Sequence, residues 1–425
     1  MLELRQHKER VENIQRQIIM QPTYSQLNTL CGGARLILLD ANEFIPNRDF
    51  KNLDAYRGYG DHVNSYVRWY CNRNRKVEGD EWDKLYWQTY LNGARARIFN
   101  DYLLFLERKR DPRNMFYKPK IKQFEKFKLI EAYQGMLDDR YDRLCISLPP
   151  GTGKTTLLKF FHSAIIGWFP EDYSLFCSHS GDITRMYYDG VYQMIDDTIE
   201  YAWNEIFPGL KITSTNALMQ QFNVGSYKPF PSLQTTSIGA NSSGKVRANK
   251  YLLSDDLIGN SEQALNKNYL DKIWRFYSVD AKQRKTVDSD GKSCKEIMQA
   301  TRWSNQDVIG RVIILYQDDP RTKIISVPAV DPITGESNFN AVGGFTKEFF
   351  ADQELTMDEI SYKCLFMQEP IEREGLLFPG EKIQRYKELP KGTPELITAQ
   401  CDTKSSGTDF FVLPVFLKYG NLYYC

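Results

Sequence analysis

The sequence predicts an α/β protein with a mainly parallel sheet flanked by helices, preceded by a helical region. Two observations lead to this prediction. From about residue 143 onward, short apolar runs that end in polar residues alternate with stretches of helical spacing, which is the pattern of strands joined by crossover helices. Residues 1–115 instead mix tyrosines, tryptophans and charges at near-helical spacing, as in a small helical domain with an aromatic core. A DNA- or partner-binding arm is the alternative interpretation of residues 1–115.

Length and composition limit the class of protein. A chain of 425 residues suggests about two or three domains. The hydrophobic fraction of 42%, the charged fraction of 26% and the net charge of +1 are those of a globular protein, so any surface for a polyanion must be a local patch. The eight cysteines are widely spaced, which argues against a zinc site and for a reducing compartment. Neither a secretory signal nor an apolar run long enough for a membrane span is visible.

The most informative stretch is Arg143–Thr156, which combines a strand, a glycine loop and the start of a helix. The apolar run Leu144–Ile146 predicts a buried strand, and helical spacing begins at Lys154. This order is required of a phosphate-binding loop, because glycines let backbone N–H groups turn towards phosphate oxygens and the helix N-terminus adds partial positive charge. The residues predicted to bind the phosphates of a nucleotide are Pro150, Gly151, Thr152, Gly153, Lys154, Thr155 and Thr156.

Within this loop, Lys154 supplies a full positive charge, and the hydroxyl of Thr155 is a predicted ligand for Mg²⁺. The usual signature begins with a glycine, whereas this sequence has Leu148 at that position. The Gly-Lys-Thr end is intact, and the prediction is therefore retained over its alternative, a glycine-rich turn beside a surface lysine.

A basic segment between Arg108 and Lys128 precedes the loop. Such a segment suits contact with a phosphate backbone, and a solvated linker with a helix face explains it equally well. Within it, Gln123 is a candidate for binding the adenine edge of a nucleotide, because an amide offers both a donor and an acceptor. The alternative is an ordinary glutamine in the first turn of a helix.

Apolar runs downstream of the loop predict further strands, and ligands in such sheets bind at the carboxyl ends of the strands. The ranges predicted as strands are 173–177, 250–254, 296–301 and 323–327, and a helix is predicted over 183–195.

The apolar run Tyr251–Ser254 leads directly into two acids. Asp255 is expected to hold Mg²⁺, directly or through water. Asp256 is expected to point the other way in the pleat and to polarise an attacking water. Cleavage of a triphosphate depends on positioning and charge stabilisation, so both acids are expected beside the γ-phosphate. A plain exit from strand to loop is the alternative, and a preceding phosphate-binding loop disfavours it.

A third motif spans Met298–Gly310. It predicts a strand that ends in Thr301 and Arg302, followed by a helix with Asp307 near its start. A threonine or a glutamine at this position is suited to sense the γ-phosphate. We interpret Arg302 as a structural ion-pair partner rather than a catalytic residue.

Taken in order, these motifs resemble those of the large terminase subunit of tailed bacteriophages, the DNA-packaging motor. The resemblance covers about residue 115 to the end, and Thr-Arg-Trp after an Asp-Asp strand, followed by Gln-Glu-Pro, is quite specific to that family. The segments that carry it are Leu148–Thr155, Ser178–Gly181, Gly244–Asn249, Leu252–Asp256, Gln299–Trp303, Ile325–Ala329, Cys364–Pro370 and Gly375–Phe378.

The resemblance implies a P-loop ATPase domain of the ASCE, ring-forming translocase type, joined to a nuclease domain with a ribonuclease H-like fold. It implies that Lys154 and Thr155 bind phosphate and Mg²⁺ of ATP, that Asp255 is the metal-associated acid and Asp256 the catalytic carboxylate. Thr301 would belong to the motif that couples hydrolysis to movement.

Because members of this family work as rings, the resemblance also implies an arginine that reaches the γ-phosphate from a neighbouring subunit. Arg185 is the candidate, and Arg247 and Arg302 are its alternatives. The implied partners are double-stranded DNA, the portal protein, the small terminase subunit and further copies of the chain in a homo-oligomeric ring, a pentamer on the procapsid. The implied location is the host bacterial cytoplasm, transiently at the portal vertex of the procapsid, and not the virion.

The predicted domains are a helical region over 1–115, an ATPase domain with lid and linker elements over 116–386, a proline- and glycine-marked linker over 387–395, and the opening of the nuclease domain over 396–425. By the resemblance, Asp402 is the first acid of a nuclease site that uses Mg²⁺ or Mn²⁺, and such a site needs several converging carboxylates. Because the other acids are not in this sequence, we expect the chain to lack DNA-cleaving activity.

Two other classes of protein share part of this pattern. A helicase-like or other nucleic-acid-remodelling ATPase would share the phosphate-binding loop and the Asp-Asp strand, together with further helicase motifs and a second ATPase-like lobe. A P-loop kinase or non-motor nucleotide-binding module would share less, and its turnover would not respond to DNA.

Overall fold

The computed structural model describes residues 2–17, 22–76, 79–240, 245–340, 344–370, 386–401 and 413–425. The chain divides into two compact units, Met1–Ile371 and Glu372–Cys425, and each is described by itself. Within the described ranges, no helix is both long enough and apolar enough to cross a membrane.

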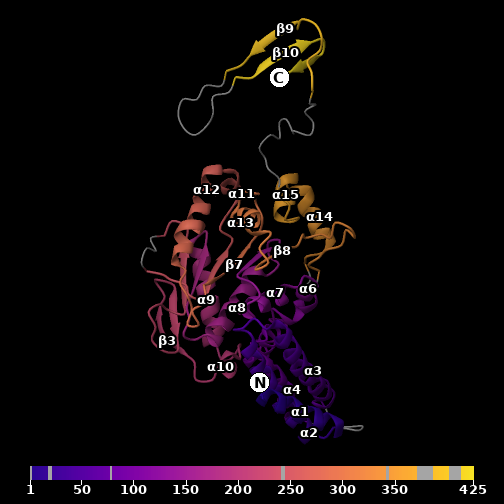
Figure 1. The fold of residues 1–425 in the computed structure, drawn as a ribbon, viewed down its shortest axis with the longest axis vertical. Coiled ribbons are helices and arrows are strands. Elements are labelled where there is room, and N and C mark those ends of the chain that lie inside the picture. Colours follow the sequence, from indigo (N-terminus) through magenta and orange to yellow (C-terminus); the bar gives the residue numbers. More distant parts are fainter. Residues whose placement is uncertain are drawn as a thin grey trace. The chain divides into compact units, whose positions relative to one another are not determined.

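The first unit is built on an eight-stranded sheet with the strand order β3-β4-β5-β2-β6-β7-β1-β8 (Figure 1). Neighbouring strands from β5 to β8 in this order run parallel, whereas β3–β4 and β4–β5 are antiparallel. The predicted α/β fold with a mainly parallel sheet is therefore confirmed. The strands are β1 (Arg143–Ser147), β2 (Ser174–Ser178), β3 (Ile212–Asn216), β4 (Gln221–Val224), β5 (Leu233–Ser237), β6 (Tyr251–Asp255), β7 (Lys295–Ala300) and β8 (Thr322–Ser326).

Five strands of this sheet, β1, β2, β6, β7 and β8, were predicted from the sequence, and their predicted bounds lie within one residue of the observed ones. The sequence did not predict β3, β4 and β5, which extend one edge of the sheet. The residues of β3 are largely exposed, so no buried apolar run marks that strand.

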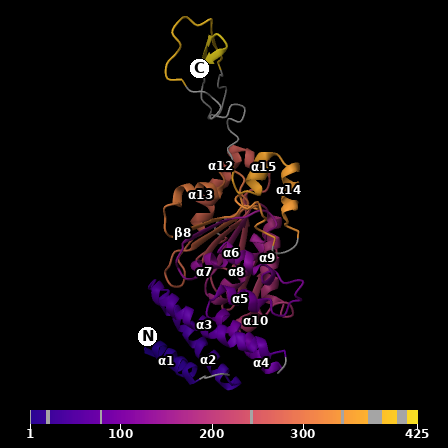
Figure 2. The same cartoon turned by 90° about the vertical axis from the view of Figure 1, so that its right-hand side faces the viewer.

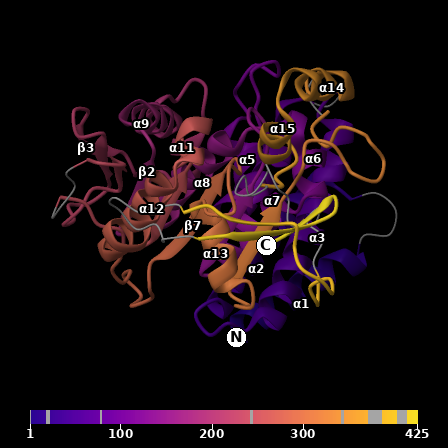
Figure 3. The ribbon, with the colours of Figure 1, turned by 90° about the horizontal axis from the view of Figure 1, so that it is seen from above.

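Helices cover both faces of the sheet (Figure 3). Leu144 and Ile146 of β1 face one core with α5, α7, α8, α9 and α10, whereas Cys145 faces a second core with α11, α12 and α13. The alternation follows from the pleat of the strand. The helices around the sheet are α5 (Phe99–Leu106), α6 (Ile121–Lys126), α7 (Leu129–Leu137), α8 (Lys154–Trp168), α9 (Gly181–Asp196), α10 (Trp203–Ile206), α11 (Ser261–Leu265), α12 (Lys267–Arg275) and α13 (Val308–Tyr316), with the short turns η2 (Lys118–Lys120), η3 (Phe276–Ala281) and η4 (Lys282–Arg284).

A small helical element follows β8. Its helices are α14 (Lys347–Thr356) and α15 (Glu359–Leu365), which share a core of aromatic and aliphatic residues. The second unit is a three-stranded antiparallel sheet of order β11-β10-β9, with the strands β9 (Leu396–Ala399), β10 (Val415–Tyr419) and β11 (Leu422–Tyr424). The strands expected over 396–402, 410–417 and 422–425 are observed only in part, because residues 402–412 lie outside the described ranges.

The N-terminal region is a helical bundle with its own core, as predicted (Figure 2). Aromatic side chains contribute to it through edge-on and stacked pairs, such as Tyr24 with Trp82 and Phe44 with Tyr56, an arrangement that ring quadrupoles favour. The helices are α1 (Leu2–Gln17), α2 (Tyr24–Ala41), η1 (Asn42–Phe44), α3 (Phe50–Asn74) and α4 (Asp80–Arg95).

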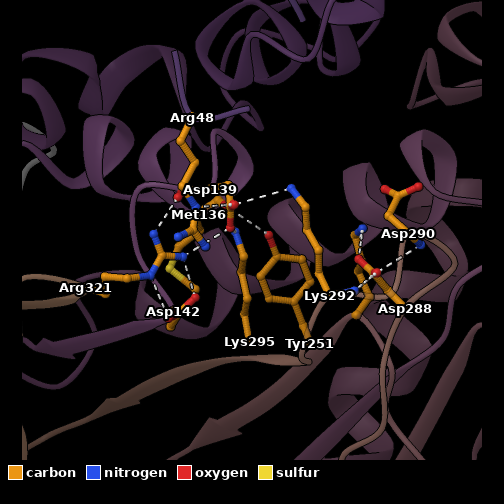
Figure 4. A network of polar contacts seen from close by, with 11 residues as sticks. Arg48, Met136, Asp139, Asp142, Tyr251, Asp288, Asp290, Lys292, Lys295 and Arg321 are labelled. Carbon is orange, nitrogen blue, oxygen red and sulfur yellow. Dashed lines mark hydrogen bonds and ion pairs between the residues drawn. The ribbon is translucent and has the colours of Figure 1, made fainter. Parts of the chain in front are cut away.

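A network of charges joins this bundle to the amino-terminal ends of the strands (Figure 4). Asp139, which follows α7, accepts from Arg48 of the bundle at 3.0 Å and from Lys295 of β7 at 2.9 Å. Lys292 and Arg321 approach the same carboxylate at 3.3 and 3.2 Å. The side chain of Asp139 is only 5% exposed, so its charge is compensated almost entirely by these cations.

We predict that Asp139→Asn destabilises the fold by about 3 kcal/mol at pH 7, because it leaves several partly buried cations without their shared anion. Asparagine tolerates the left-handed backbone of this residue, φ 59°, so the change reports on charge. Lys295, with the other cations, outweighs the effect of burial and holds the pKa of Asp139 well below its usual range.

A carboxylate with a depressed folded-state pKa stabilises above its unfolded pKa of about 4 and loses that contribution as the pH falls. The difference in free energy of unfolding between wild type and Asp139→Asn, measured by urea unfolding, should therefore become smaller below about pH 4. Asp111→Asn is the control, because Asp111 pairs with Arg113 two residues away at the surface. Equal stabilities of wild type and Asp139→Asn at pH 7 would contradict this account of the network.

Candidate nucleotide-binding site

The phosphate-binding loop lies between the end of β1 at Ser147 and the start of α8 at Lys154. Gly151 and Gly153 adopt φ values of 75° and 101°, which favour glycine. A Cβ at Gly151 would lie 2.9 Å from the Phe345 ring, and one at Gly153 would lie 2.7 Å from the Phe116 ring. Backbone conformation and space therefore both require glycine at these positions.

Lys154 is buried, with 6% of its surface exposed. Its Nζ donates to the carbonyl oxygens of Leu148 at 3.0 Å and Pro149 at 3.4 Å, and to Oγ1 of Thr301 at 2.8 Å. No carboxylate forms an ion pair with it in the part of the chain that the structure describes. An ammonium buried among neutral oxygens lacks a countercharge, so this site is suited to bind an anion.

Leu148, the departure from the usual signature, serves this arrangement through its backbone. Its side chain is buried, and its carbonyl is an acceptor for Lys154. The hydroxyl of Thr152 donates to the carbonyl of Pro149 at 2.8 Å and so tightens the loop. The loop geometry thus does not depend on a glycine at position 148.

Asp255 ends β6 beside the loop, as predicted. The hydroxyl of Thr155 donates to its Oδ2 at 2.5 Å, and its Oδ1 is buried without a hydrogen-bond partner. Burial and the neighbouring carboxylate of Asp256 raise the pKa of Asp255. A hydroxyl and an incompletely satisfied carboxylate are hard oxygen ligands of the kind Mg²⁺ prefers, and these two residues therefore fit such an ion.

Asp256 does not follow the expected alternation of the pleat, because β6 ends at Asp255. Its backbone is left-handed, with φ 39°, a conformation that costs about 1–2 kcal/mol for a residue with a side chain. Its N–H donates to the carbonyl of Gln299 at 3.0 Å, and its Oδ1 accepts from the N–H of Thr301 at 2.8 Å. The turn, rather than the pleat, directs the carboxylate.

Thr301, just beyond the end of β7, joins the two halves of the site. Its hydroxyl accepts from Lys154, and its N–H donates to Asp256. The parallel register, in which Ser147 pairs with Ala300 and Asp255 with Gln299, brings these strand ends to one edge. The structure therefore gathers Lys154, Thr155, Asp255, Asp256 and Thr301 at one place.

Gln123 is buried in the first turn of α6, and no hydrogen bond joins it to this cluster among the described residues. Its neighbour Phe124 packs at 5.9 Å between ring centroids against Phe116, the ring that covers Gly153. This places α6 near the outer side of the loop, and the adenine role of Gln123 stays a prediction.

The candidate arginines differ in exposure. Arg302 is buried and pairs with Asp307 at 2.9 Å, which confirms its structural role and opposes a reach to a neighbouring subunit. Arg185 is exposed on α9, where it pairs with Asp189 at 3.3 Å and donates to the carbonyl of Ala217. Arg247 donates to the carbonyl of Gln283 at 2.8 Å. Asp402 lies outside the described residues.

The sequence analysis missed the role of His179 in the site. Its Nδ1 lies 2.7 Å from the carbonyl oxygen of Asp256, so the imidazole donates a hydrogen bond that holds the left-handed residue from the side of β2. Gln299 was noted only as a possible γ-phosphate sensor. It lies opposite Asp255 in the sheet, and its Oε1 accepts from Tyr133 at 3.2 Å. A signal for both residues was available in the sequence. His179 and Gln299 are polar residues at the carboxyl ends of buried strands, and both strands are neighbours of the strand that leads into the two acids.

No protein-family model and no curated protein sequence matches the chain. Among solved structures, the large terminase of bacteriophage HK97 is similar, with 14% identity and a TM-score of 0.43, over 76% of this chain and 66% of that one. The large terminase ATPase domain of Thermus phage P74-26 has 10% identity and a TM-score of 0.37, over 60% of this chain and 100% of that one. The large terminase of another thermophilic bacteriophage, in complex with ATP-γ-S, has 11% identity and a TM-score of 0.37, over 72% of this chain and 66% of that one.

This chain thus spans slightly less than two thirds of the first and the third of these proteins. Likenesses this distant carry no argument about function. The chemistry that the site supports is instead defined by its residues, which combine an anion-binding loop, a pair of hard oxygen ligands and a second carboxylate.

For the ATP hydrolysis proposed below, we predict that His179→Ala lowers kcat about tenfold, because the change removes one hydrogen bond that holds Asp256. KM for ATP should change little, because His179 contacts Asp256 and not the loop. His179→Asn should restore most of the rate, since its amide can donate from a similar position. Steady-state kinetics check this, and an asparagine variant no faster than the alanine variant would contradict the positioning role.

Proposed function

We propose that this chain is the ATP-hydrolysing motor of a bacteriophage large terminase subunit, which moves double-stranded DNA into a procapsid. The observation that carries the ATPase part is a pair of contact sets on adjacent residues: Thr155 binds Asp255, and Lys154 is linked through Thr301 to Asp256. The order of the sequence motifs supports the terminase part, because the same residues occur within the Asp-Asp and Thr-Arg-Trp segments of that resemblance.

In this proposal, the N–H groups of the loop and the N-terminus of α8 bind the phosphates of ATP. When ATP binds, the Lys154 ammonium exchanges its contacts with neutral carbonyl and hydroxyl oxygens for a contact with a negatively charged phosphate oxygen. Thr155 and Asp255 hold Mg²⁺, which supplies charge neutralisation of the phosphates. Thr301 contacts both Lys154 and Asp256, so a change at the lysine is passed to the carboxylate.

Asp256 is the residue that polarises the attacking water. One of its oxygens accepts from Thr301, and no hydrogen bond to the other is present among the described residues. The side chain is half-buried, so the second oxygen is accessible to water. Asp255, fully buried and bound to Thr155, is not placed for that task.

The remaining parts of the proposal rest on the resemblance. Copies of the chain assemble as a ring on the portal protein together with the small terminase subunit in the host cytoplasm, and an arginine from one copy reaches the γ-phosphate of the next. Residues 396–425 open a nuclease domain that cuts DNA in the complete protein, with Asp402 as a metal ligand.

We predict that Lys154→Ala lowers the rate of ATP hydrolysis at least a hundredfold, because it removes the only side-chain cation that the described loop places beside the phosphates. Lys272→Ala is the control, since Lys272 is exposed on α12 and lies outside the basic segment Arg108–Lys128. Phosphate release measured with and without double-stranded DNA checks both the site and its substrate class.

The outcomes separate the proposals. Wild-type turnover in Lys154→Ala would remove the ATPase assignment. Turnover that requires Lys154 and does not respond to DNA would favour a non-motor nucleotide-binding module. Stimulation by single-stranded but not double-stranded DNA would favour a helicase-like ATPase over a packaging motor.

The arginine in trans is tested by mixing variants. We predict that Arg185→Ala is inactive alone and regains activity when mixed with Lys154→Ala, because each protein then supplies what the other lacks across an interface. Arg247→Ala is assayed in parallel as the alternative. Rescue with Arg247→Ala and none with Arg185→Ala would transfer the role to Arg247, and rescue with neither would contradict a shared site.

A further inference from the structure

The N-terminal bundle has a cavity of about 570 Å³ between α1, α2 and α4, helices that lie together in Figure 2. The cavity is open to solvent, and its residues Asn28, Gly32 and Arg35 are exposed. This volume lies within the range of small-molecule sites, roughly 300–1,000 Å³. It is formed by the helical region alone and is separate from the phosphate-binding loop. Its lining includes Asn28, Gly32, Arg35, Gln88, Asn92 and Arg95.

The charges of this cavity are unbalanced. Arg35 and Arg95 line it, and no aspartate or glutamate is among its described lining residues. Arg95 donates from Nε to the carbonyl of Ile206 at 3.2 Å and from Nη2 to that of Glu205 at 2.8 Å. Burial and the positive charge of Arg35 lower the pKa of Arg95, which shows that the two cations influence one another.

Other arginines of the same bundle have acidic partners. Arg57 pairs with Asp138 at 2.6 Å, Arg68 with Asp101 at 3.4 Å and Arg75 with Asp83 at 3.1 Å. Within the described ranges, neither cavity arginine forms an ion pair. Arg35 is exposed and Arg95 is partly buried, so an anionic ligand entering from solvent would meet two arginines and no described acid of the lining.

Gly32 lies at the solvent-exposed mouth of the cavity. Glycine in a helix interior is destabilising, so it calls for a reason. Its neighbour Gly33 has one, because a Cβ there would lie 2.4 Å from a methyl of Val11 in α1. A Cβ at Gly32 would meet nothing within 4 Å. Gly32 therefore faces the open side of the cavity, and a larger side chain there would project into it.

We propose that this cavity binds the phosphate group of a small phosphorylated ligand, with Arg35 and Arg95 as its cationic contacts. A planar guanidinium matches the oxygens of a phosphate in geometry as well as in charge. The amides of Asn28 and Gln88 line the remainder and suit the polar body of such a ligand. The amide of Asn92 is held in place by the carbonyl of Cys31 at 3.0 Å and shapes the floor.

The test uses the full chain carrying Lys154→Ala, which removes phosphate binding at the loop. Thermal unfolding is followed while inorganic phosphate or AMP is added. A ligand that binds only the folded state should raise Tm by about 3 °C at a tenfold excess over its Kd, and the rise should saturate. Arg35→Gln should abolish the rise, and Arg73→Gln, at an exposed arginine outside the cavity, should leave it unchanged.

Gly32→Leu is the second variant. It should fold at least as well as the parent, because leucine is the better helix former and its Cβ meets no neighbour, and it should lose the response by filling the cavity. The proposal is overturned if neither phosphate nor AMP gives a saturable rise, if Arg35→Gln or Gly32→Leu responds like the parent, or if only double-stranded DNA stabilises the protein. None of these results bears on the ATPase assignment.

Discussion

A buried lysine ammonium held by neutral oxygens is the interaction on which the rest of the site depends. Removing a charged amine from water is unfavourable unless hydrogen bonds replace its hydration. Here the carbonyls of Leu148 and Pro149 and the hydroxyl of Thr301 replace it. These contacts connect the loop after β1 to the end of β7. The oxygens of Leu148, Pro149 and Thr301 carry only partial negative charges, whereas a phosphate oxygen would carry a full one. The loop is thus folded and short of negative charge.

The two adjacent acids acquire different surroundings from one feature of the backbone. Asp255 remains in the strand, buried and bound to Thr155. Asp256 turns out of the strand with a positive φ and is held by Gln299, Thr301 and His179. Such strained residues persist where the surroundings fix them from several sides, often at functional sites. One acid is consequently suited to a metal and the other to water.

Much of this arrangement could be predicted from the sequence, because it depends on patterns within short segments of the chain. The apolar run at Leu144–Ile146, the glycines after it and the helical spacing from Lys154 indicate strand, loop and helix without reference to the rest of the chain. The contact of His179 with Asp256 joins residues 77 positions apart, and no local pattern carries it. The left-handed backbone of Asp256 was missed because an apolar run does not specify the backbone conformation of the residue that follows the strand. The exposed residues of β3 gave no signal of a strand, since their pairing is set by β4.

The most direct measurement is an experimental structure of the chain with ATP-γ-S and Mg²⁺. The account predicts that the triphosphate occupies the loop at Gly151–Gly153, that the Lys154 ammonium contacts phosphate oxygens, and that Thr155 and Asp255 face the metal with Asp256 on the side of the terminal phosphate. A nucleotide bound elsewhere, with Lys154 still enclosed by Leu148, Pro149 and Thr301, would contradict it.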